Sequence, residues 1–406
     1  MKCFVGLDDT DSSAGYCTTY LAYRIAADLR DDLRVLPYPR LVRLNPNIPF
    51  KTRGNAAVCL SIETADSERA FRRICSKVSE LSDVDGGANS GVVFLDDLGS
   101  IKPFEGLYLD ALCGLVNVHR VEKLLREFGV RTMTLGNGMG LVGAASSLGF
   151  DERFDHTYEL ISYRLKEFWG KPRAVDAQSV KEMDRLTYPR TFNNYDYQKR
   201  KVLIAPHGPD PVFVGIRGDS PETVVSAFEM IRKGEELDGH MVYLSNQHTE
   251  AHLARELDWK VFSSGWVVGN VEDLEVGQGG HLYFTLRTGD KRRHCAVYEP
   301  TGDLRRAAKL LRQGDEVKAY GGVRRATSLH PKVLNVERID VLSLASDRGE
   351  RTLVTGSYVA SPRANRHLSK PLIRYGNEVA GKPSKAVADW LRFNSVIPTP
   401  ALARSP

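Results

Sequence analysis

The chain has 406 residues, a length that usually divides into two or more domains. Hydrophobic residues make up 42% of it, and no stretch approaches the roughly 18 uninterrupted apolar residues of a membrane-spanning helix. The six cysteines are scattered without a Cys-x-x-Cys pair, which argues against a zinc ribbon and a disulfide framework. Because the first residues already read as a strand, we expect a cytoplasmic protein without a leader or a membrane partner.

The charge is distributed unevenly behind a net value of +5. Residues 258–406 carry 24 Lys and Arg against 15 Asp and Glu, whereas the first 257 residues carry 32 against 36. A basic C-terminal third suits a polyanion such as nucleic acid, and an acidic N-terminal part suits a metal ion or a cationic substrate. A modest positive surplus is also common on solvated surfaces, so charge alone leaves both interpretations open.

Strand and helix patterns alternate over residues 1–155, which predicts an α/β unit. The predicted strands are 2–7, 56–63 and a third that starts at residue 130, and the predicted helices are 18–29, 67–81 and 115–129. The third strand leads into a glycine-rich loop and then into a further helix. This order places several polar loops at strand ends.

Two smaller units and a tail follow. Residues 156–257 alternate short helices and strands, and a ferredoxin-like sheet is the packing we expect. Residues 258–345 give three strands, a short helix and two more strands, which is the element order of an OB-fold barrel. Residues 346–406 read as a linker and a basic strap. We therefore predict an α+β multidomain protein.

Three carboxylates follow the first strand within four positions: Asp8, Asp9 and Asp11. Mg²⁺ prefers oxygen ligands and usually takes one or two carboxylates together with substrate phosphates. The alternative is that Asp11 or Ser12 caps the next helix and its neighbours are solvated. Thr18 lies in the first turn of that helix, where a hydroxyl could accept a phosphoryl group, although β-branched residues there more often only pack.

Further polar loops of the first unit suit a phosphate-bearing ligand, because backbone N–H groups in glycine loops bind anions. The candidate residues are Lys51, Arg53, Gly54, Asn55, Gly136, Asn137, Gly138 and Gly140. No Walker lysine follows the glycines, and they could equally serve a tight turn. In the second unit Asp196, His207 and Asp210 are candidates for a cationic substrate, with plain turn chemistry as the alternative.

Basic and aromatic residues interleave in the third unit, a composition typical of OB surfaces that bind nucleic acid. The candidate nucleic-acid-binding residues are Lys291, Arg292, Arg293, Arg324, Arg325, Arg363, Arg366, His367 and Lys370. The last four belong to the basic strap. Part of the aromatic set must form the barrel core, so aromatic residues alone do not locate a binding face.

Four stretches resemble, in chain order, the archaeal tRNA(Ile) 2-agmatinylcytidine synthetase family: GLDDTDSSAGYCTTYLA, NPNIPFKTRGNAA, VLIAPHGPDPVFVGIRGD and PRANRHLSKPLIRYG. The resemblance implies a kinase-like domain, a ferredoxin-like domain, an OB-fold and a zinc ribbon. It implies a carbon–nitrogen ligase that uses ATP and Mg²⁺ to phosphorylate the ring carbonyl of the wobble cytidine, whereupon agmatine displaces the phosphate. The RNA would be the isoleucine tRNA with a CAU anticodon.

The resemblance also implies roles for particular residues. Asp8, Asp9 and Asp11 would handle metal and ATP, and Thr18 would become phosphorylated. The departure is the zinc ribbon, because no cysteine follows Cys295 and no zinc is expected. In the family that module helps to grip the body of the tRNA, so tRNA affinity or selectivity is the property in doubt. The alternatives are a non-catalytic tRNA-binding relative and a small-molecule kinase with a changed acceptor.

Overall fold

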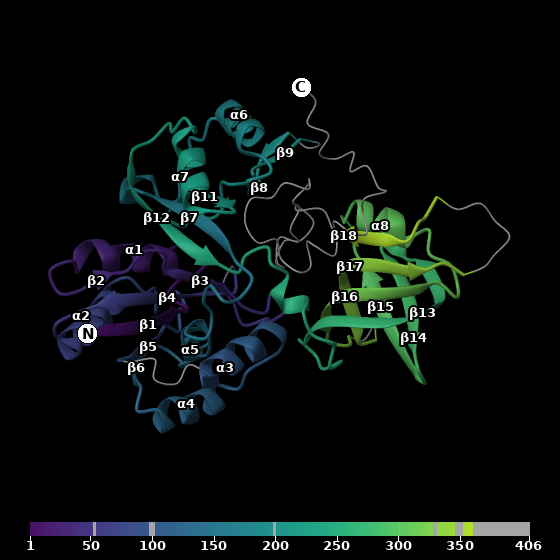
Figure 1. Ribbon diagram of the computed structural model, residues 1–406, viewed down its shortest axis with the longest axis horizontal. Coiled ribbons are helices and arrows are strands. Elements are labelled where there is room, and N and C mark those ends of the chain that lie inside the picture. The colour runs from purple at the N-terminus through teal and green to yellow at the C-terminus, as the bar shows by residue number, and fades with distance from the viewer. Residues whose placement is uncertain are drawn as a thin grey trace.

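The computed structural model describes residues 1–51, 54–96, 102–197, 200–299, 301–327, 331–345 and 352–359. Figure 1 shows two units of helices and strands, coloured purple to teal, beside a barrel coloured green to yellow. The mixed α+β class and the multidomain organisation predicted from the sequence are confirmed. The predicted boundaries at residues 155, 257 and 345 remain predictions.

The first unit is an antiparallel sheet covered by helices on both faces. Its strands are β1 (Lys2–Asp8), β2 (Arg34–Val35), β3 (Arg40–Arg43), β4 (Ala56–Glu63), β5 (Gly91–Leu95) and β6 (Arg131–Thr134). Its helices are α1 (Thr18–Asp28), α2 (Ser67–Glu80), α3 (Lys102–Cys113), α4 (Val118–Glu127) and α5 (Gly140–Ser147). The sheet order begins β6-β5-β1-β4-β3, which puts β1 at its centre.

Alternation along β1 explains why both faces are buried. Val5 and Leu7 belong to the core cluster under α1 and α2, whereas Phe4 belongs to the cluster that contains residues of α3, α4 and α5. Gly6 lets α5 approach closely, since a Cβ there would lie 2.0 Å from the Ala144 carbonyl oxygen. The end of β1 and the start of α5 are therefore held together.

The second unit has the ferredoxin-like topology that the sequence predicts. Its elements are β7 (Thr157–Arg164), α6 (Ala177–Thr187), β8 (Thr191–Phe192), β11 (Val212–Gly218), α7 (Pro221–Glu229) and β12 (Leu237–Ser245), with a small pair β9 (Tyr195–Asp196) and β10 (Lys201–Val202). The strand order is β12-β7-β11-β8. Because β12 also pairs in parallel with β3, the two units share one ten-stranded sheet.

The third unit is a closed barrel with the predicted order of three strands, a helix and two strands. Its elements are β13 (Ser264–Val276), β14 (Leu282–Thr288), β15 (Lys291–Val297), α8 (Asp303–Ala308), β16 (Glu316–Arg324) and β17 (Val333–Ser343), with β18 (Gly356–Val359) added at one edge. The parallel pairing of β15 with β17 closes it. The OB-fold prediction is confirmed.

Three short 3₁₀ turns complete the described elements: η1 (Lys166–Phe168), η2 (Ala251–Leu253) and η3 (Gln278–Gly280). The turn η2 leads from the shared sheet into the barrel. There Arg338 of the barrel donates to Glu250 at 3.2 Å, and His252 contacts Glu337 at 3.1 Å. These buried polar pairs join the second and third units. Over the described ranges, no helix has both the length and the apolar character needed to cross a membrane.

Candidate functional site

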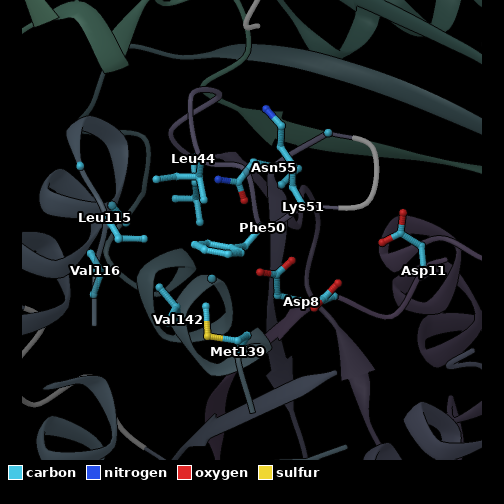
Figure 2. Close-up of a pocket in the computed structure, with 17 residues that line it drawn as sticks. Asp8, Asp11, Leu44, Phe50, Lys51, Asn55, Leu115, Val116, Met139 and Val142 are labelled. Carbon is cyan, nitrogen blue, oxygen red and sulfur yellow. The ribbon is translucent and has the colours of Figure 1, made fainter. Parts of the chain in front are cut away.

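One cavity collects candidate residues from several loops of the first unit at the end of β1. It has about 690 Å³ of empty space, including an opening to solvent. Its lining comprises Asp8, Asp9, Asp11, Leu44, Ile48, Phe50, Lys51, Gly54, Asn55, Ala56, Ala111, Gly114, Leu115, Val116, Met139, Val142 and Gly143. Figure 2 shows an apolar side around Leu115 and Val142 and a polar side around Asp8 and Lys51. Such a combination suits a ligand with an aromatic base and a charged chain.

The carboxyl group of Asp8 lies against helix α5. A Cβ at Gly143 would come within 1.8 Å of Asp8 Oδ2, so the glycine makes the room that this carboxyl occupies. Burial raises the pKa of Asp8 well above its usual range, and the negative charges of Asp9 and Asp11 raise it further. The protein alone therefore holds this carboxylate at an energetic cost, which a cation would remove.

Asp9 is held by a neighbouring loop. Its backbone is in the left-handed region with φ of 55°, and hydrogen bonds from Asn89 partly oppose the rise of its pKa that burial and Asp11 cause. Asn89 also accepts from the backbone N–H of Asn137 at 3.0 Å. Asn89 thus ties the aspartate cluster to the glycine loop, a role that sequence reasoning did not assign.

The aspartates partly fit a magnesium ion. Across the ranges that the structure describes, no group of three His, Cys, Asp or Glu side chains is placed to hold a metal by itself. Figure 2 shows Asp11 set apart from Asp8, although both line the cavity. Because Mg²⁺ needs only one or two protein carboxylates when phosphates supply other ligands, Asp8 and Asp9 suit an ion that arrives with a nucleotide. The metal role stays a prediction.

Lys51 supplies the positive charge of the cavity. Its Nζ donates to the carbonyl oxygen of Pro46. Burial first, and then the positive charge of Arg324 in the barrel, lower the pKa of Lys51 to about 8, and the negative charge of Glu337 opposes them in part. Gly54 and Asn55, two more predicted ligand-binding residues, line the same cavity. Arg53 lies outside the described residues.

The glycine loop serves close packing in this structure. Gly136 and Gly138 have φ of 68° and 76°, which favours glycine. A Cβ at Gly140 would meet the Asn89 carbonyl oxygen at 2.5 Å. The four predicted residues Gly136, Asn137, Gly138 and Gly140 are absent from the cavity lining, whereas Met139 beside them belongs to it. Their role as an anion cradle stays a prediction.

Thr18 begins helix α1 and is buried. Its hydroxyl lies 3.0 Å from the hydroxyl of Thr10, and the residue is not part of the cavity lining. Thr19, the next hydroxyl, lies 3.0 Å from Cys17 Sγ. Since Thr10 lies between Asp9 and Asp11 in the chain, Thr18 is close to the cluster through Thr10 without facing the cavity.

The three predicted cation-binding residues of the second unit differ in burial and in the elements to which they belong. Asp210 is buried, accepts from Arg173 at 3.3 Å and accepts from the backbone of Val212 at 3.1 Å. His207 is exposed, and Asp196 is part of the small pair β9–β10. The segment reaches the aspartate loop, because Pro209 O would lie 3.8 Å from a Cβ at Gly15. Binding of agmatine by these residues is untested.

Several basic candidates of the barrel already contact a neighbouring side chain. Arg292 pairs with Glu272 at 2.7 Å and with Asp273 at 2.9 Å, while Lys291 is exposed. The guanidinium of Arg293 lies 4.6 Å from the ring centroid of Trp259, and that of Arg325 lies 5.7 Å from Phe262. Arg324 acts electrostatically on the cavity lysine. Arg363, Arg366, His367 and Lys370 lie outside the described residues.

Sequence reasoning missed the apolar wall of the cavity. The missed residues are Leu44, Ile48, Phe50, Leu115, Val116, Met139 and Val142. Their signal was available in one feature only: Phe50 is a large apolar residue in a polar loop and is 64% exposed. Exposed aromatic rings beside a cavity are typical of base-binding walls.

Comparisons with known proteins identify relatives of this chain. A family model described as the TiaS TCKD domain matches residues 4–137, and one described as the TiaS FLD domain matches residues 138–252. The isoleucine-tRNA 2-agmatinylcytidine synthetase TiaS of Cenarchaeum symbiosum is 42% identical over 346 residues, which cover 84% of this chain and 77% of that relative.

Two solved structures are similar over nearly the whole length. The complex of TiaS with isoleucine tRNA and ATP has a TM-score of 0.85 and 32% identity, with 94% of this chain and 100% of that chain covered. The ZRD-deleted mutant of TiaS in complex with agmatine has a TM-score of 0.78 and 30% identity, with 94% and 99% covered. At these identities the similarity extends beyond the fold to the sequence.

Proposed function

Because the chain belongs to the family of the isoleucine-tRNA 2-agmatinylcytidine synthetases, we propose that it is an ATP-dependent enzyme that joins agmatine to the wobble cytidine of isoleucine tRNA. The observation that carries the proposal is the cavity at the end of β1. It combines an apolar wall, carboxylates at the end of a central strand and a lysine. Solved relatives hold ATP, isoleucine tRNA and agmatine, which supports the same ligands here.

We propose that the apolar wall takes the adenine base and that Lys51 and the aspartates face the phosphates. Phe50 and Val142 give a flat apolar contact, while Lys51 offers a charge-assisted hydrogen bond. Asp8 and Asp9 would hold Mg²⁺, which neutralises charge on the transferring phosphoryl group when it is bound. The residues that line the cavity would position the nucleotide, exclude water from it and balance its charge.

The chemical steps in this proposal follow the expectation from the sequence. The ring-carbonyl oxygen of the wobble cytidine receives a phosphoryl group from ATP, and ADP leaves. The agmatine amine then attacks the ring carbon that bears this oxygen. The oxygen leaves with the phosphate, and the amine loses a proton. Thr18 would carry a phosphoryl group during turnover, although its hydroxyl now faces Thr10 at 3.0 Å. If Thr18 donates in that contact, its phosphorylation breaks the hydrogen bond to Thr10.

Because no cysteine follows Cys295, we propose that the chain lacks the zinc ribbon, and that this difference bears on RNA binding more than on chemistry. The ZRD-deleted mutant of TiaS, which we take to lack the zinc ribbon, was solved in complex with agmatine. This supports agmatine binding without that module. The barrel and its exposed basic residues would then hold the RNA with a smaller set of contacts. We propose that the reaction takes place in the cytoplasm and that the chain binds its tRNA more weakly than relatives that have the module.

Incubation of the full chain with ATP, Mg²⁺, agmatine and a CAU-anticodon isoleucine tRNA transcript tests the proposed function. We expect the digested nucleosides to contain a cytidine whose mass has risen by agmatine minus water. The reaction should require both ATP and agmatine. A transcript with uridine at the wobble position is the matched control and should stay unmodified.

Other outcomes separate the alternatives. RNA binding without any mass change, at every salt concentration tried, would support the non-catalytic relative. ATP consumption that depends on agmatine but not on RNA would support the small-molecule kinase. Either result contradicts the proposed ligase. A titration at several salt concentrations is needed because phosphate contacts make RNA affinity depend strongly on salt.

ATP affinity should weaken as the pH rises above about 8, because the pKa of Lys51 is lowered to about 8 in the free protein. Below that pH the ammonium is charged and binds phosphate. Above it, each pH unit should raise the Kd for ATP by up to about tenfold, until the pKa in the complex is reached. Isothermal titration calorimetry between pH 6.5 and 9.5, a range of about three units, would measure the Kd for ATP as a function of pH.

Arginine keeps its charge throughout that range, so Lys51→Arg should remove the break near pH 8. Lys123→Arg on the exposed face of α4 is the control and should keep the wild-type profile. A wild-type Kd that stays constant up to pH 9.5 would show that the Lys51 ammonium does not bind ATP.

A further inference from the structure

The loop of residues 44–51, here called the wall loop, is bonded to the barrel. Asn45 Nδ2 donates to the carbonyl oxygen of Phe262 at 2.7 Å, and its Oδ1 accepts from Ser264 Oγ at 2.8 Å. Asn47 Nδ2 donates to the carbonyl oxygen of Val323 at 2.9 Å. Both asparagines are almost completely buried. These side chains therefore connect the first unit to the barrel backbone.

The barrel has a place shaped for Asn47. A Cβ at Gly322 would lie 2.6 Å from Asn47 Cγ and 2.7 Å from Nδ2. The backbone of Gly322 lies outside the left-handed region, so the glycine is explained by space and not by conformation. The Val323 carbonyl oxygen also accepts from the Phe262 N–H at 2.9 Å. Asn47 thus donates a second hydrogen bond to the Val323 carbonyl oxygen, which already accepts one from the Phe262 N–H.

The same wall loop forms one side of the cavity. Leu44, Ile48, Phe50 and Lys51 all line it. At its base the loop is closed by a hydrogen bond from Asn55 Nδ2 to the Asn45 carbonyl oxygen at 2.8 Å. The barrel residues Arg324 and Glu337 lie within electrostatic reach of Lys51. The same short segment therefore contacts the barrel end on one side and forms the cavity wall on the other.

We propose that Asn47, seated against Gly322, is a positioning residue that lets the barrel set the shape of the ATP cavity. Through the wall loop, RNA bound to the barrel and ATP bound in the cavity would change each other's affinity by the same factor. This inference rests on the proposed function, because it takes ATP and RNA as the two ligands. Asn47 touches neither the carboxylates nor the cavity, so it acts through Ile48, Phe50 and Lys51.

The test measures ATP binding by the full chain with and without the tRNA transcript. In the wild type we expect saturating RNA to change the Kd for ATP by about fivefold or more. Asn47→Ala should raise the KM for ATP about tenfold and leave kcat within about twofold, because it frees a binding wall and leaves the reacting groups in place. In Asn47→Ala, the Kd for ATP with RNA and the Kd for ATP without RNA should be about equal, so that their ratio is about one.

Gly322→Ala approaches the same contact from the barrel side. Its new Cβ displaces the Asn47 side chain, so it should reproduce the ATP effect of Asn47→Ala. The double variant should lose little more than either single variant, since both break one contact and their effects are not additive. Asn270→Ala is the matched control, because Asn270 is exposed on β13 and bonds within the barrel to Gly314 O. It should keep wild-type ATP binding.

The possible results separate this inference from the proposed function. If the wild-type chain binds no ATP, the proposed function fails. If it binds ATP and modifies the tRNA, but RNA leaves its ATP Kd unchanged or Asn47→Ala and Gly322→Ala keep the wild-type ratio, the positioning role of Asn47 is overturned. If Asn47→Ala unfolds below the assay temperature, Gly322→Ala decides the question, because its backbone conformation is accessible to alanine.

Discussion

Asp8→Asn should abolish ATP-dependent modification of the tRNA while leaving the fold intact. Asparagine has nearly the same shape as aspartate and fits beside Gly143, where the carboxyl group now lies. It lacks the charge that we propose holds Mg²⁺ against the phosphates. We expect the rate to fall by about a thousandfold or more, the magnitude typical when a group that stabilises transition-state charge is removed. Nucleoside mass analysis after single-turnover incubation measures it.

The same substitution should not lower stability. Burial and the charges of Asp9 and Asp11 raise the pKa of Asp8 in the folded protein. A raised folded-state pKa adds stability at low pH, and that contribution is lost as the pH rises through the folded-state value. At pH 7 the wild type has lost at least part of it, whereas asparagine carries no charge at any pH. We expect Asp8→Asn to melt at the wild-type temperature or about 1–3 °C above it.

Asp85→Asn is the control for this experiment, because Asp85 is an exposed residue of the same charge in a nearby loop. It should keep both activity and melting temperature. If Asp8→Asn retained more than about a tenth of the wild-type rate, Asp8 would not be a metal or phosphate residue. A large drop in its melting temperature would show instead that the carboxylate has a structural partner.

Thr18→Val should eliminate the phosphate that becomes attached to the protein and reduce tRNA modification by about a hundredfold or more, if Thr18 accepts a phosphoryl group as proposed. Valine preserves the volume of this buried side chain and removes only the hydroxyl. The hydroxyl of Thr10 would lose its partner, and stability should fall by about 1–2 kcal/mol. Incubation with γ-labelled ATP and peptide mapping measures the phosphate.

Thr19→Val and Thr10→Val are matched controls for Thr18→Val. Thr19 is the adjacent buried hydroxyl, and its contact is Cys17 Sγ. Thr10→Val breaks the contact between Thr10 and Thr18 yet leaves the Thr18 hydroxyl present. Both should keep protein-bound phosphate on Thr18. Phosphate that persists unchanged in Thr18→Val would remove this residue from the mechanism.

The sequence predicted elements best where burial repeats regularly. β1, β4, α1 and α2 were located closely, because their apolar positions alternate or follow helical spacing. The barrel order was also readable, since each strand is bounded by a turn. The strand β7 was missed. It buries Glu159 and Arg164 in ion pairs, and these polar residues interrupt the apolar pattern.

The candidate site was predictable in part for a similar reason. The aspartates, Lys51, Gly54 and Asn55 lie in or beside polar or glycine-containing loops between secondary-structure elements, and the structure brings them to one cavity. Apart from Phe50, the apolar wall was not predictable, because residues such as Leu115 and Met139 look like ordinary core residues along the chain. Asp210 shows a different case: the sequence offered it as a candidate for a cationic substrate or as a turn residue, and the structure pairs it with Arg173.

The sequence by itself determined the fold class, the family and the acidic end of β1, because local spacing and long motifs carry that information. Only the tertiary structure decided which residues face the cavity. It also set the wall loop, which follows β3 in the chain, against the barrel. The physical reason is distance along the chain: Asn47 and Val323 are joined by a hydrogen bond across 276 positions. Such contacts depend on how the packed units meet.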